Sequence, residues 1–181
     1  MMNNNKYTEK KEYYDNGKLN YHFKFKNGKK HGIQKHYYDT ENLWYHYKLK
    51  NGIRHGEKKG YYRDGKLSYH CNYKNGLQHG IQKYYYDNGK LMYHNNYKNG
   101  KQHGEQKGYY SNGKLSYHYK FKNGLIHSIQ KGYYRNGKLN CHHNYKNGLK
   151  YGDQKDYKNG NLWYHSKCYN NKQQGIEINY E

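Results

Sequence analysis

Fourteen histidines are the residues of this sequence best suited to chemistry, because imidazole binds metals and exchanges protons near neutral pH. Most of them fall into two periodic columns: His22, His46, His70, His94, His118, His142 and His165, and then His31, His55, His79, His103 and His127. Two imidazoles on one zinc ion need nitrogens within about 4 Å of each other, whereas column members two strands apart are separated by roughly 9–10 Å. The columns therefore predict no metal site.

Cys141, His142 and His143 are the only local cluster of metal-ligand types. Neighbours in a strand point to opposite faces, so this cluster suggests adventitious metal at most. Cys71 and Cys168 are distant, and three widely spaced cysteines fit neither a disulfide framework nor a zinc motif. The 13 acidic residues are scattered, and no nucleophilic serine or phosphate-binding glycine motif occurs. We expect no catalytic residue, no metal, no cofactor and no small-molecule substrate.

Lysines form the strongest candidate binding surface. Five of them recur in one column, and three histidines are expected on the same face: Lys35, Lys59, Lys83, Lys107, Lys131, His46, His70 and His94. A net charge of +21 attracts polyanions, either acidic phospholipid or nucleic acid. The alternative is that lysine only keeps an open sheet soluble. Lysine in place of arginine disfavours specific readout of phosphates or bases, because bidentate geometry is missing.

Tyrosines form the second candidate surface, on the opposite face. One column contains Tyr21, Tyr45, Tyr69, Tyr93 and Tyr117. A long exposed aromatic strip marks an interaction surface, which favours a protein partner or a homodimer. Close packing of the tyrosines among themselves could instead hide much of the strip.

The composition limits the elements that can carry these columns. The chain has no Ala, Val or Pro, and 11 Leu with 7 Ile are too few for a conventional two-layer core. An aromatic content of 19% argues against disorder. No apolar run reaches the ~20 residues that a bilayer requires, and residues 1–6 carry no secretory signal. These features indicate an intracellular, cytoplasmic protein that is neither secreted nor transmembrane.

An internal repeat of 24 residues organises the whole chain. The string Tyr61–Leu67 recurs at residues 13–19, 85–91, 109–115 and 133–139, and the string Tyr73–Gly80 recurs at residues 97–104. Seven units fill residues 7–181 as one repeat domain after a polar tail over residues 1–6. The last strand, with Ile178 where earlier units have Lys, is expected to cap the domain.

Each unit has two turn slots, and twelve of the fourteen slots hold Asn-Gly or Asp-Gly. These dipeptides favour type I′ hairpin turns, and the slots at Thr40-Glu41 and Asn171-Lys172 depart from the pattern. The predicted fold is all-β, an elongated single-layer antiparallel meander of about fourteen strands built from repeated β-hairpins.

Two-residue turns in every slot predict specific cross-strand pairs. Tyr14 should pair with Leu19, Tyr21 with Gln34, and Phe23 with Gly32. The same register places His46 opposite Glu57, His94 opposite Glu105 and His142 opposite Asp153, while Ile33, Ile81 and Ile129 face His22, His70 and His118. We therefore expect the acid-paired histidines to titrate higher. Gly60, in mid-strand, should tolerate a side chain better than the turn glycine Gly76.

The string Tyr-Lys-Asn-Gly-x-x-His-Gly, as at Tyr97–Gly104, resembles the core of the MORN repeat, and Tyr-Tyr-x-Asn-Gly-Lys-Leu resembles its variant form. The resemblance implies sheets of β-hairpins that act as scaffolds, dimerisation surfaces or binders of acidic phospholipid, with no enzymatic activity of their own. Similar AT-rich repeat proteins are encoded by giant DNA viruses and their satellites, which suggests a viral origin and a location in the host cytoplasm or the virion. Ser128 and Tyr151, which replace Gly and His of the repeat, depart from the pattern.

Overall fold

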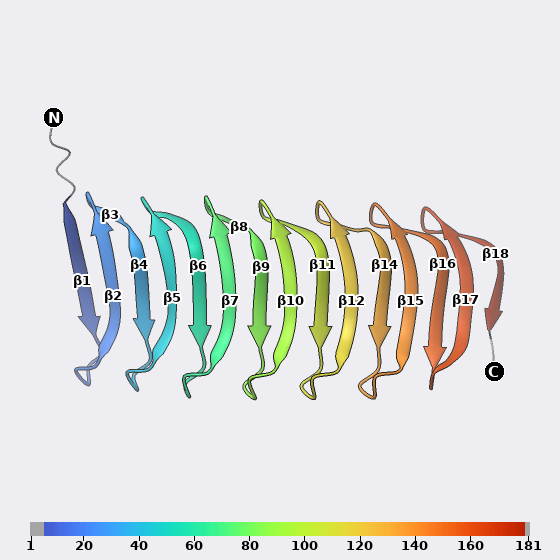
Figure 1. The fold of residues 1–181 in the computed structure, drawn as a ribbon, viewed down its shortest axis with the longest axis horizontal. Coiled ribbons are helices and arrows are strands. Elements are labelled where there is room, and N and C mark those ends of the chain that lie inside the picture. The colour runs from blue at the N-terminus through green and yellow to red at the C-terminus, as the bar shows by residue number, and fades with distance from the viewer. Residues whose placement is uncertain (1–5, 180–181) are drawn as a thin grey trace. The chain divides into compact units, whose positions relative to one another are not determined.

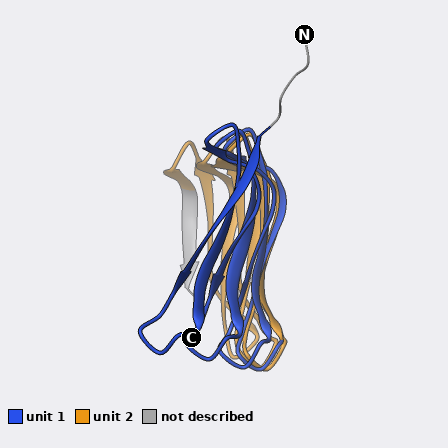
Figure 2. Ribbon diagram, turned by 90° about the vertical axis from the view of Figure 1, so that its left-hand side faces the viewer, with its two compact units in different colours: residues 1–89 blue, residues 90–181 orange. Residues whose placement is uncertain are grey.

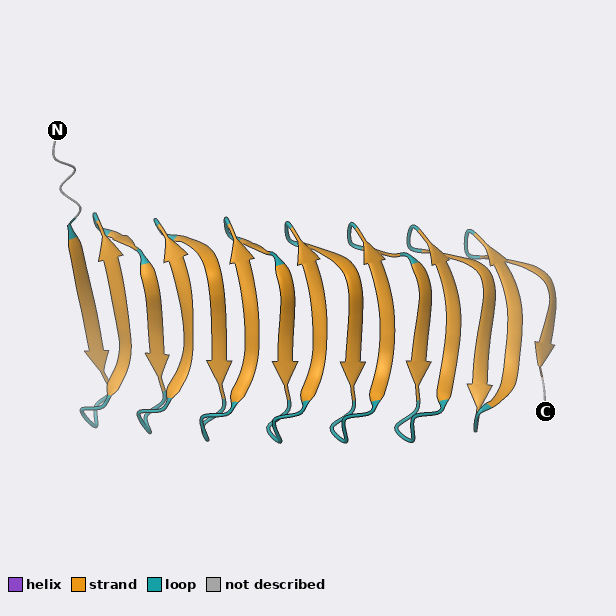
Figure 3. Ribbon diagram, in the orientation of Figure 1, coloured by secondary structure: helices purple, strands orange, loops and turns teal. Residues whose placement is uncertain are grey.

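The computed structural model describes residues 6–179, and the side chains to Gln174. This part of the chain consists of β-strands and turns without a helix (Figure 3), so it contains no helix that could cross a membrane. Its contacts group into two units, Met1–Gly89 and Lys90–Glu181 (Figure 2). Within each unit, strands that follow one another in sequence pair antiparallel. The predicted all-β hairpin meander is confirmed.

The first unit contains nine strands (Figure 1). They are β1 (Tyr7–Tyr13), β2 (Leu19–Lys26), β3 (Lys29–Lys30), β4 (Gly32–Tyr37), β5 (Leu43–Lys50), β6 (Ile53–Tyr61), β7 (Leu67–Lys74), β8 (Leu77–Gln78) and β9 (Gly80–Tyr85).

The second unit also contains nine strands. They are β10 (Leu91–Lys98), β11 (Lys101–Tyr109), β12 (Leu115–Lys122), β13 (Leu125–Ile126), β14 (Ser128–Tyr133), β15 (Leu139–Lys146), β16 (Leu149–Lys158), β17 (Asn161–Tyr169) and β18 (Lys172–Asn179). The strand count of eighteen exceeds the expected fourteen mainly because β3, β8 and β13 are two-residue pieces. Each is separated from the next strand by a single histidine.

The narrow turns have the predicted geometry. Asn27 has a φ of 51° and Gly28 a φ of 74°, the two positive values that define a type I′ turn. Narrow turns within each unit also bond to the chain before them, as when the Gly52 amide donates to the Lys30 carbonyl and the Gly124 amide to the Gln102 carbonyl, both at 2.8 Å. The last narrow turn is Asn170-Asn171, one residue before the expected slot, with φ values of 49° and 65°.

The other turns are wider than predicted, except Asn159-Gly160, which is a two-residue turn between the paired residues Lys158 and Asn161. The Tyr14 amide donates to the Lys18 carbonyl and the Gly17 amide to the Tyr14 carbonyl, so the loop spans five residues and closes on a Tyr13–Leu19 pair. The expected Tyr14–Leu19 pair was wrong. A bulge between Glu12 and Tyr13 absorbs the difference, so the rest of β1 pairs with β2 in the predicted register.

A second bulge changes the pairing in the other hairpins. Tyr21 lies opposite His36 and not Gln34, and His22 lies opposite Lys35. The chain gains two residues at His31-Gly32, where Gly32 takes a φ of 76°. A shift of two leaves every side chain on its predicted face, because the period of a strand is two. It changes every cross-strand partner beyond the bulge.

The buried layer is largely polar. Gln34 and Gln82 have 0% of their surface exposed, whereas the buried apolar residues of the described part are only Phe23, Leu49 and Cys71. The Gln34 side chain fills the bulge: its Nε2 donates to the Lys24 carbonyl at 3.0 Å, and its Oε1 accepts from the Lys24 amide at 3.2 Å. The glutamine therefore supplies a partner for the Lys24 amide and a second donor to the Lys24 carbonyl, which also accepts from the His31 amide at 2.8 Å.

Tyrosine hydroxyls connect successive repeats. The Tyr38 hydroxyl donates to the Tyr61 carbonyl at 2.9 Å, and the Tyr62 hydroxyl donates to the Tyr85 carbonyl at 2.6 Å. In the second unit the Tyr110 hydroxyl repeats this bond to the Tyr133 carbonyl at 2.7 Å. Each bond spans 23 residues of sequence, so it fixes one unit of the repeat on the next.

Mid-strand glycines make room for tyrosine rings. A Cβ placed on Gly60 would lie 2.2 Å from the Tyr69 ring, so Gly60 is a close-approach position. A Cβ on Gly76 would meet only Ile53, at 3.5 Å, although Gly76 has a φ of +84°. Gly60 is therefore not expected to tolerate a side chain better than Gly76 does.

The predicted cap lies mostly outside the described side chains. The backbone of Ile178 pairs with His165 at the end of β18, but its side chain lies outside the described part, as do Tyr180 and residues 1–5 of the predicted tail.

Candidate binding face

The predicted lysine and histidine columns merge into one row on one face of each sheet. In the first unit the pairing runs from strand to strand through His22, Lys35, His46, Lys59, His70 and Lys83. In the second unit it runs through His94, Lys107, His118, Lys131, His142, Lys155 and His165. We call these alignments the His–Lys row and the side of the strands that carries them the His–Lys face. Neighbours in the row are one strand spacing, about 4.8 Å, apart.

Carboxylates neutralise the row at every second hairpin. Glu57 contacts the Lys59 amine at 2.9 Å and the His70 ring at 3.4 Å, and Glu105 lies 3.0 Å from Lys107. The Lys59 ammonium holds the pKa of Glu57 below its ordinary value. Glu9 repeats the arrangement in the first hairpin, where it lies 2.8 Å from His22.

The predicted histidine–acid pairs were therefore wrong. The bulge places Lys59 and not Glu57 opposite His46, and Lys155 and not Asp153 opposite His142. The histidines of the row that contact carboxylates are His22, His70, His118 and His165, and the first three belong to the set that was predicted to face isoleucine. The carboxylate contacts therefore alternate along the row as expected, but they fall on the set of histidines opposite to the predicted one.

Burial lowers the pKa of three histidines of the row. Burial, followed by Lys59, lowers the pKa of His46, and burial followed by Lys131 and Lys155 lowers that of His142. Burial also lowers the pKa of His118, against the opposing effect of Glu105. Lysine therefore carries the positive charge of the row at neutral pH.

Three lysines lie beside an exposed isoleucine instead of a carboxylate. Lys35, Lys83 and Lys131 follow Ile33, Ile81 and Ile129 by two residues in β4, β9 and β14, on the same face. These isoleucines are 42%, 48% and 41% exposed. Within residues 6–179, none of the three lysines has a carboxylate oxygen within 4.0 Å.

The Tyr face, the opposite side of the strands, is packed within itself. Tyr21, Tyr45, Tyr69, Tyr93 and Tyr117 are all half-buried. Tyr21 stacks on Phe23 at 4.2 Å between ring centroids, and Tyr117 stacks on Tyr119 at 4.7 Å. Burial raises the pKa of Tyr69 to about 12. Much of the tyrosine surface is thus used in building the sheet.

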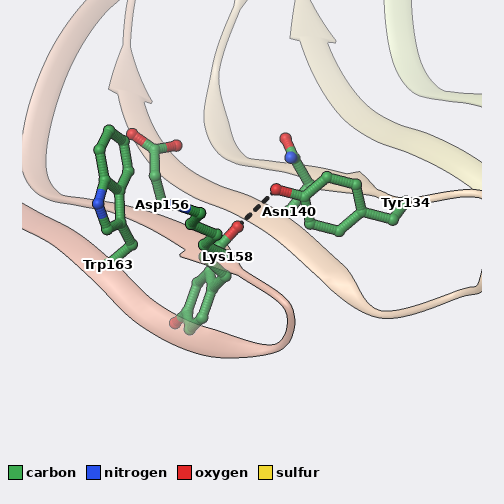
Figure 4. Close-up of a pocket in the computed structure, with 6 residues that line it drawn as sticks. Tyr134, Asn140, Asp156, Lys158 and Trp163 are labelled. Atoms are coloured by element: carbon green, nitrogen blue, oxygen red, sulfur yellow. Dashed lines mark hydrogen bonds between the residues drawn. The ribbon is translucent and has the colours of Figure 1, made fainter. Parts of the chain in front are cut away.

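A hollow of about 440 Å³ lies in the second unit beside the turn that follows β16. Tyr134, Asn140, Asp156, Tyr157, Lys158 and Trp163 line it (Figure 4). The Tyr134 hydroxyl is committed to the Tyr157 carbonyl at 2.7 Å. Asp156 is the one acidic residue among the six that line it.

The sequence interpretation missed two sets of residues. The buried glutamines recur at a fixed place, before a lysine in Gln34-Lys35, Gln82-Lys83 and Gln106-Lys107, which was the available signal. The second set is a cluster on the Tyr face. Cys141 and His143 lie there together with Asp156, while His142 takes its place in the His–Lys row.

Comparison with known families agrees with this geometry. A family profile described as MORN repeat variant matches residues 7–27, 54–75, 78–99, 102–123 and 126–147. The chain belongs to the MORN repeat family. The matches cover five repeats and more than half of the chain. MORN repeats are non-enzymatic modules that bind proteins or membranes as scaffolds.

The MORN hairpins continue between and beyond these matches, over β3 to β5 and from β16 to β18. No curated protein matches the chain. The cytoplasmic location and the viral origin stay predictions.

Proposed function

We propose that this MORN-repeat protein is a scaffold that binds membranes containing acidic phospholipid through its His–Lys face. The observation that carries the proposal is the recurring pair of an exposed isoleucine and a lysine without a carboxylate partner, at Ile33-Lys35, Ile81-Lys83 and Ile129-Lys131. Lysine attracts the head groups, and the aliphatic side chain enters the interface beside it.

The chemistry of the face favours lipid over nucleic acid. Thirty-one lysines against three arginines suit charge attraction more than bidentate contacts to phosphates or bases. Single-stranded nucleic acid is bound mainly by stacking on exposed aromatic rings. Here the exposed neighbours of Lys35, Lys83 and Lys131 along their own strands are isoleucines, which have no ring, and the rings of the row are the histidines between the lysines.

Self-association through the Tyr face is the second candidate. It is supported by the half-exposed tyrosine row that both units repeat, with Tyr21, Tyr45 and Tyr69 in the first unit and Tyr93 and Tyr117 in the second. Stacking within the row leaves less apolar surface for a partner than the composition suggests. Sedimentation of the protein at increasing concentration tests this candidate independently of lipid.

Vesicle co-sedimentation tests the lipid proposal. The wild-type protein should bind phosphatidylserine-containing vesicles, and binding should fall steeply between low and high salt. Lys35→Glu with Lys83→Glu should weaken this binding by at least about tenfold, because two attractive charges of roughly 1 kcal/mol each become repulsive. Lys30→Glu with Lys150→Glu makes the same charge change on the Tyr face and should have little effect.

A second pair of variants separates lipid from other polyanions. Ile81→Ser with Ile129→Ser should reduce vesicle binding and leave binding to a single-stranded oligonucleotide unchanged. Equal vesicle binding by both charge-reversal pairs would overturn the proposal. Loss of oligonucleotide binding alone, with vesicle binding intact in all variants, would move the function to nucleic acid.

A further inference from the structure

The hairpin of β15 and β16 departs from the hairpin 24 residues earlier, formed by β12 and β14, at three positions that lie together. Cys141 and His143 occupy the places that Tyr117 and Tyr119 hold 24 residues earlier. Asp156 stands where the preceding unit has Gly132. Two rings and a glycine are thus replaced by a thiol, an imidazole and a carboxyl, which are three metal-ligand types.

The strand pairing brings these three side chains to one spot on the Tyr face. Cys141 in β15 lies directly opposite Asp156 in β16. The His143 Nε2 lies 2.9 Å from the Asp156 Oδ1. The donor atoms of all three residues lie within 4.8 Å of one another.

Gly132 in β14 gives the thiol its place. A Cβ on Gly132 would lie 2.8 Å from the Cys141 Sγ, so a side chain there would push the sulfur away from its position. The preceding unit uses the same space differently, because the Tyr117 ring covers Gly108 with an atom 2.1 Å from the position of its missing Cβ. The fold therefore accepts either a ring or a thiol over this glycine.

We propose that Cys141, His143 and Asp156 form a binding site for a zinc-like divalent cation. A thiolate with an imidazole selects zinc or cobalt over magnesium and calcium, which prefer oxygen ligands. Tetrahedral zinc with bonds near 2.1 Å to nitrogen and oxygen and 2.3 Å to sulfur separates its ligand atoms by roughly 3.4–3.6 Å. The ligand atoms of the three residues now lie within 4.8 Å of one another, and side-chain movements of about 1 Å bring them into that range. Three protein ligands leave the fourth position to water.

Cobalt titration of the purified full-length protein tests the site, because a thiolate bound to Co²⁺ gives a charge-transfer absorption band. Wild type should develop this band together with the ligand-field bands of tetrahedral cobalt, and one equivalent of zinc should remove both. Cys141→Tyr, which restores the residue of the preceding repeat, should abolish the charge-transfer band. His143→Tyr and Asp156→Gly should each weaken cobalt binding by at least about tenfold. Loss of a group that only hydrogen-bonds to a metal ligand already costs about 10–100-fold in affinity, and these two residues are proposed as ligands themselves.

Matched controls address the other candidate ligands. His142→Asn changes the adjacent histidine on the opposite face, and Cys71→Ser changes a buried thiol elsewhere, so both should keep the wild-type titration. Circular dichroism and thermal melting of the metal-free variants verify the fold. The proposal is overturned if wild type gives no charge-transfer band, or if the band survives Cys141→Tyr. It is also overturned if His142→Asn weakens binding as much as His143→Tyr.

Discussion

At the scale of single residues, the buried glutamines replace an apolar core with hydrogen bonds. Gln82 accepts from the Asn72 amide and donates to the Asn72 carbonyl, both at 3.0 Å. Both backbone groups face the bulge at His79-Gly80, where the Asn72 carbonyl also accepts from the His79 amide at 2.9 Å and the glutamine is the partner of the Asn72 amide. A chain without Ala or Val can thus form a stable sheet, provided that each bulge contains a side chain with both a donor and an acceptor.

Gln82→Met should be strongly destabilising although it keeps the size of the side chain. The substitution leaves the Asn72 amide without its partner and removes one of the two donors to the Asn72 carbonyl, which costs about 1–3 kcal/mol of the free energy of unfolding. Urea denaturation measures the loss. Lys74→Met, at an exposed position, should change the unfolding free energy by less than about 0.5 kcal/mol. Equal effects of the two substitutions would show that the glutamine bonds do not stabilise the fold.

Glu41 and Ser128 stand at positions where the other repeats carry glycine. Glu41 has a φ of 72° and Ser128 a φ of 75°. Glu41→Gly and Ser128→Gly should each stabilise the protein by roughly 0.5–1 kcal/mol, because relief of left-handed strain exceeds the entropy that glycine adds to the unfolded chain. Melting temperatures measure the gain. The reciprocal change Gly65→Glu, at a φ of +84°, should lower the melting temperature; a rise would contradict the assigned turn.

At the scale of the hairpin, the sequence predicts the turns and faces better than the partners. Asn-Gly dipeptides specify the narrow turns, and strict alternation assigns Lys35 and His46 to one face. The bulge at Gly32 has no such signature, because a glycine after histidine fits a flat strand equally well. The two-residue error in the predicted register left every side chain on its predicted face. It hid, however, that Cys141, His143 and Asp156 lie together. The predicted register set Gln154 opposite Cys141, whereas the structure sets Asp156 there.

Tyr62→Phe tests the bonds that join successive hairpins. The variant loses only the hydroxyl that donates to the Tyr85 carbonyl at 2.6 Å, so the unfolding free energy should fall by about 1 kcal/mol. Chemical denaturation provides the value. Tyr7→Phe removes a hydroxyl from a side chain that is 65% exposed, and should be neutral. If the two variants unfold alike, packing of the rings and not the hydroxyl bonds joins the hairpins.

At the scale of the whole chain, protonation of histidine opposes folding. The folded state lowers the pKa of His36, His46, His118 and His142, mainly by burial. The folded protein therefore binds fewer protons than the unfolded chain, and stability falls as the pH drops below about 6.5. Charging all 14 histidines would also raise the net charge from +21 to +35 (21 + 14), which adds repulsion.

Urea midpoints between pH 8 and pH 5 should show this loss, with a smaller loss in His36→Tyr. Tyr84 occupies the same place as His36 two repeats later, where it pairs with Tyr69 as His36 pairs with Tyr21. The substitution thus removes a titrating group without changing the architecture. His31→Gln, which removes a histidine near a turn instead, serves as the comparison. A His36→Tyr variant with the full acid sensitivity of wild type would show that this histidine is not a source of it.

The bonded turns also bear on how the protein ages chemically. An asparagine followed by glycine deamidates when the glycine amide nitrogen attacks the asparagine side chain and closes a succinimide ring. The amides of Gly52, Gly76, Gly124 and Gly148 are each held by a carbonyl of the preceding hairpin at 2.8 Å. An engaged nitrogen on a fixed backbone cannot readily reach the side chain. A sequence so rich in Asn-Gly should therefore accumulate isoaspartate at these turns only when its hairpins open, so that isoaspartate formed on storage records how often each turn unfolds.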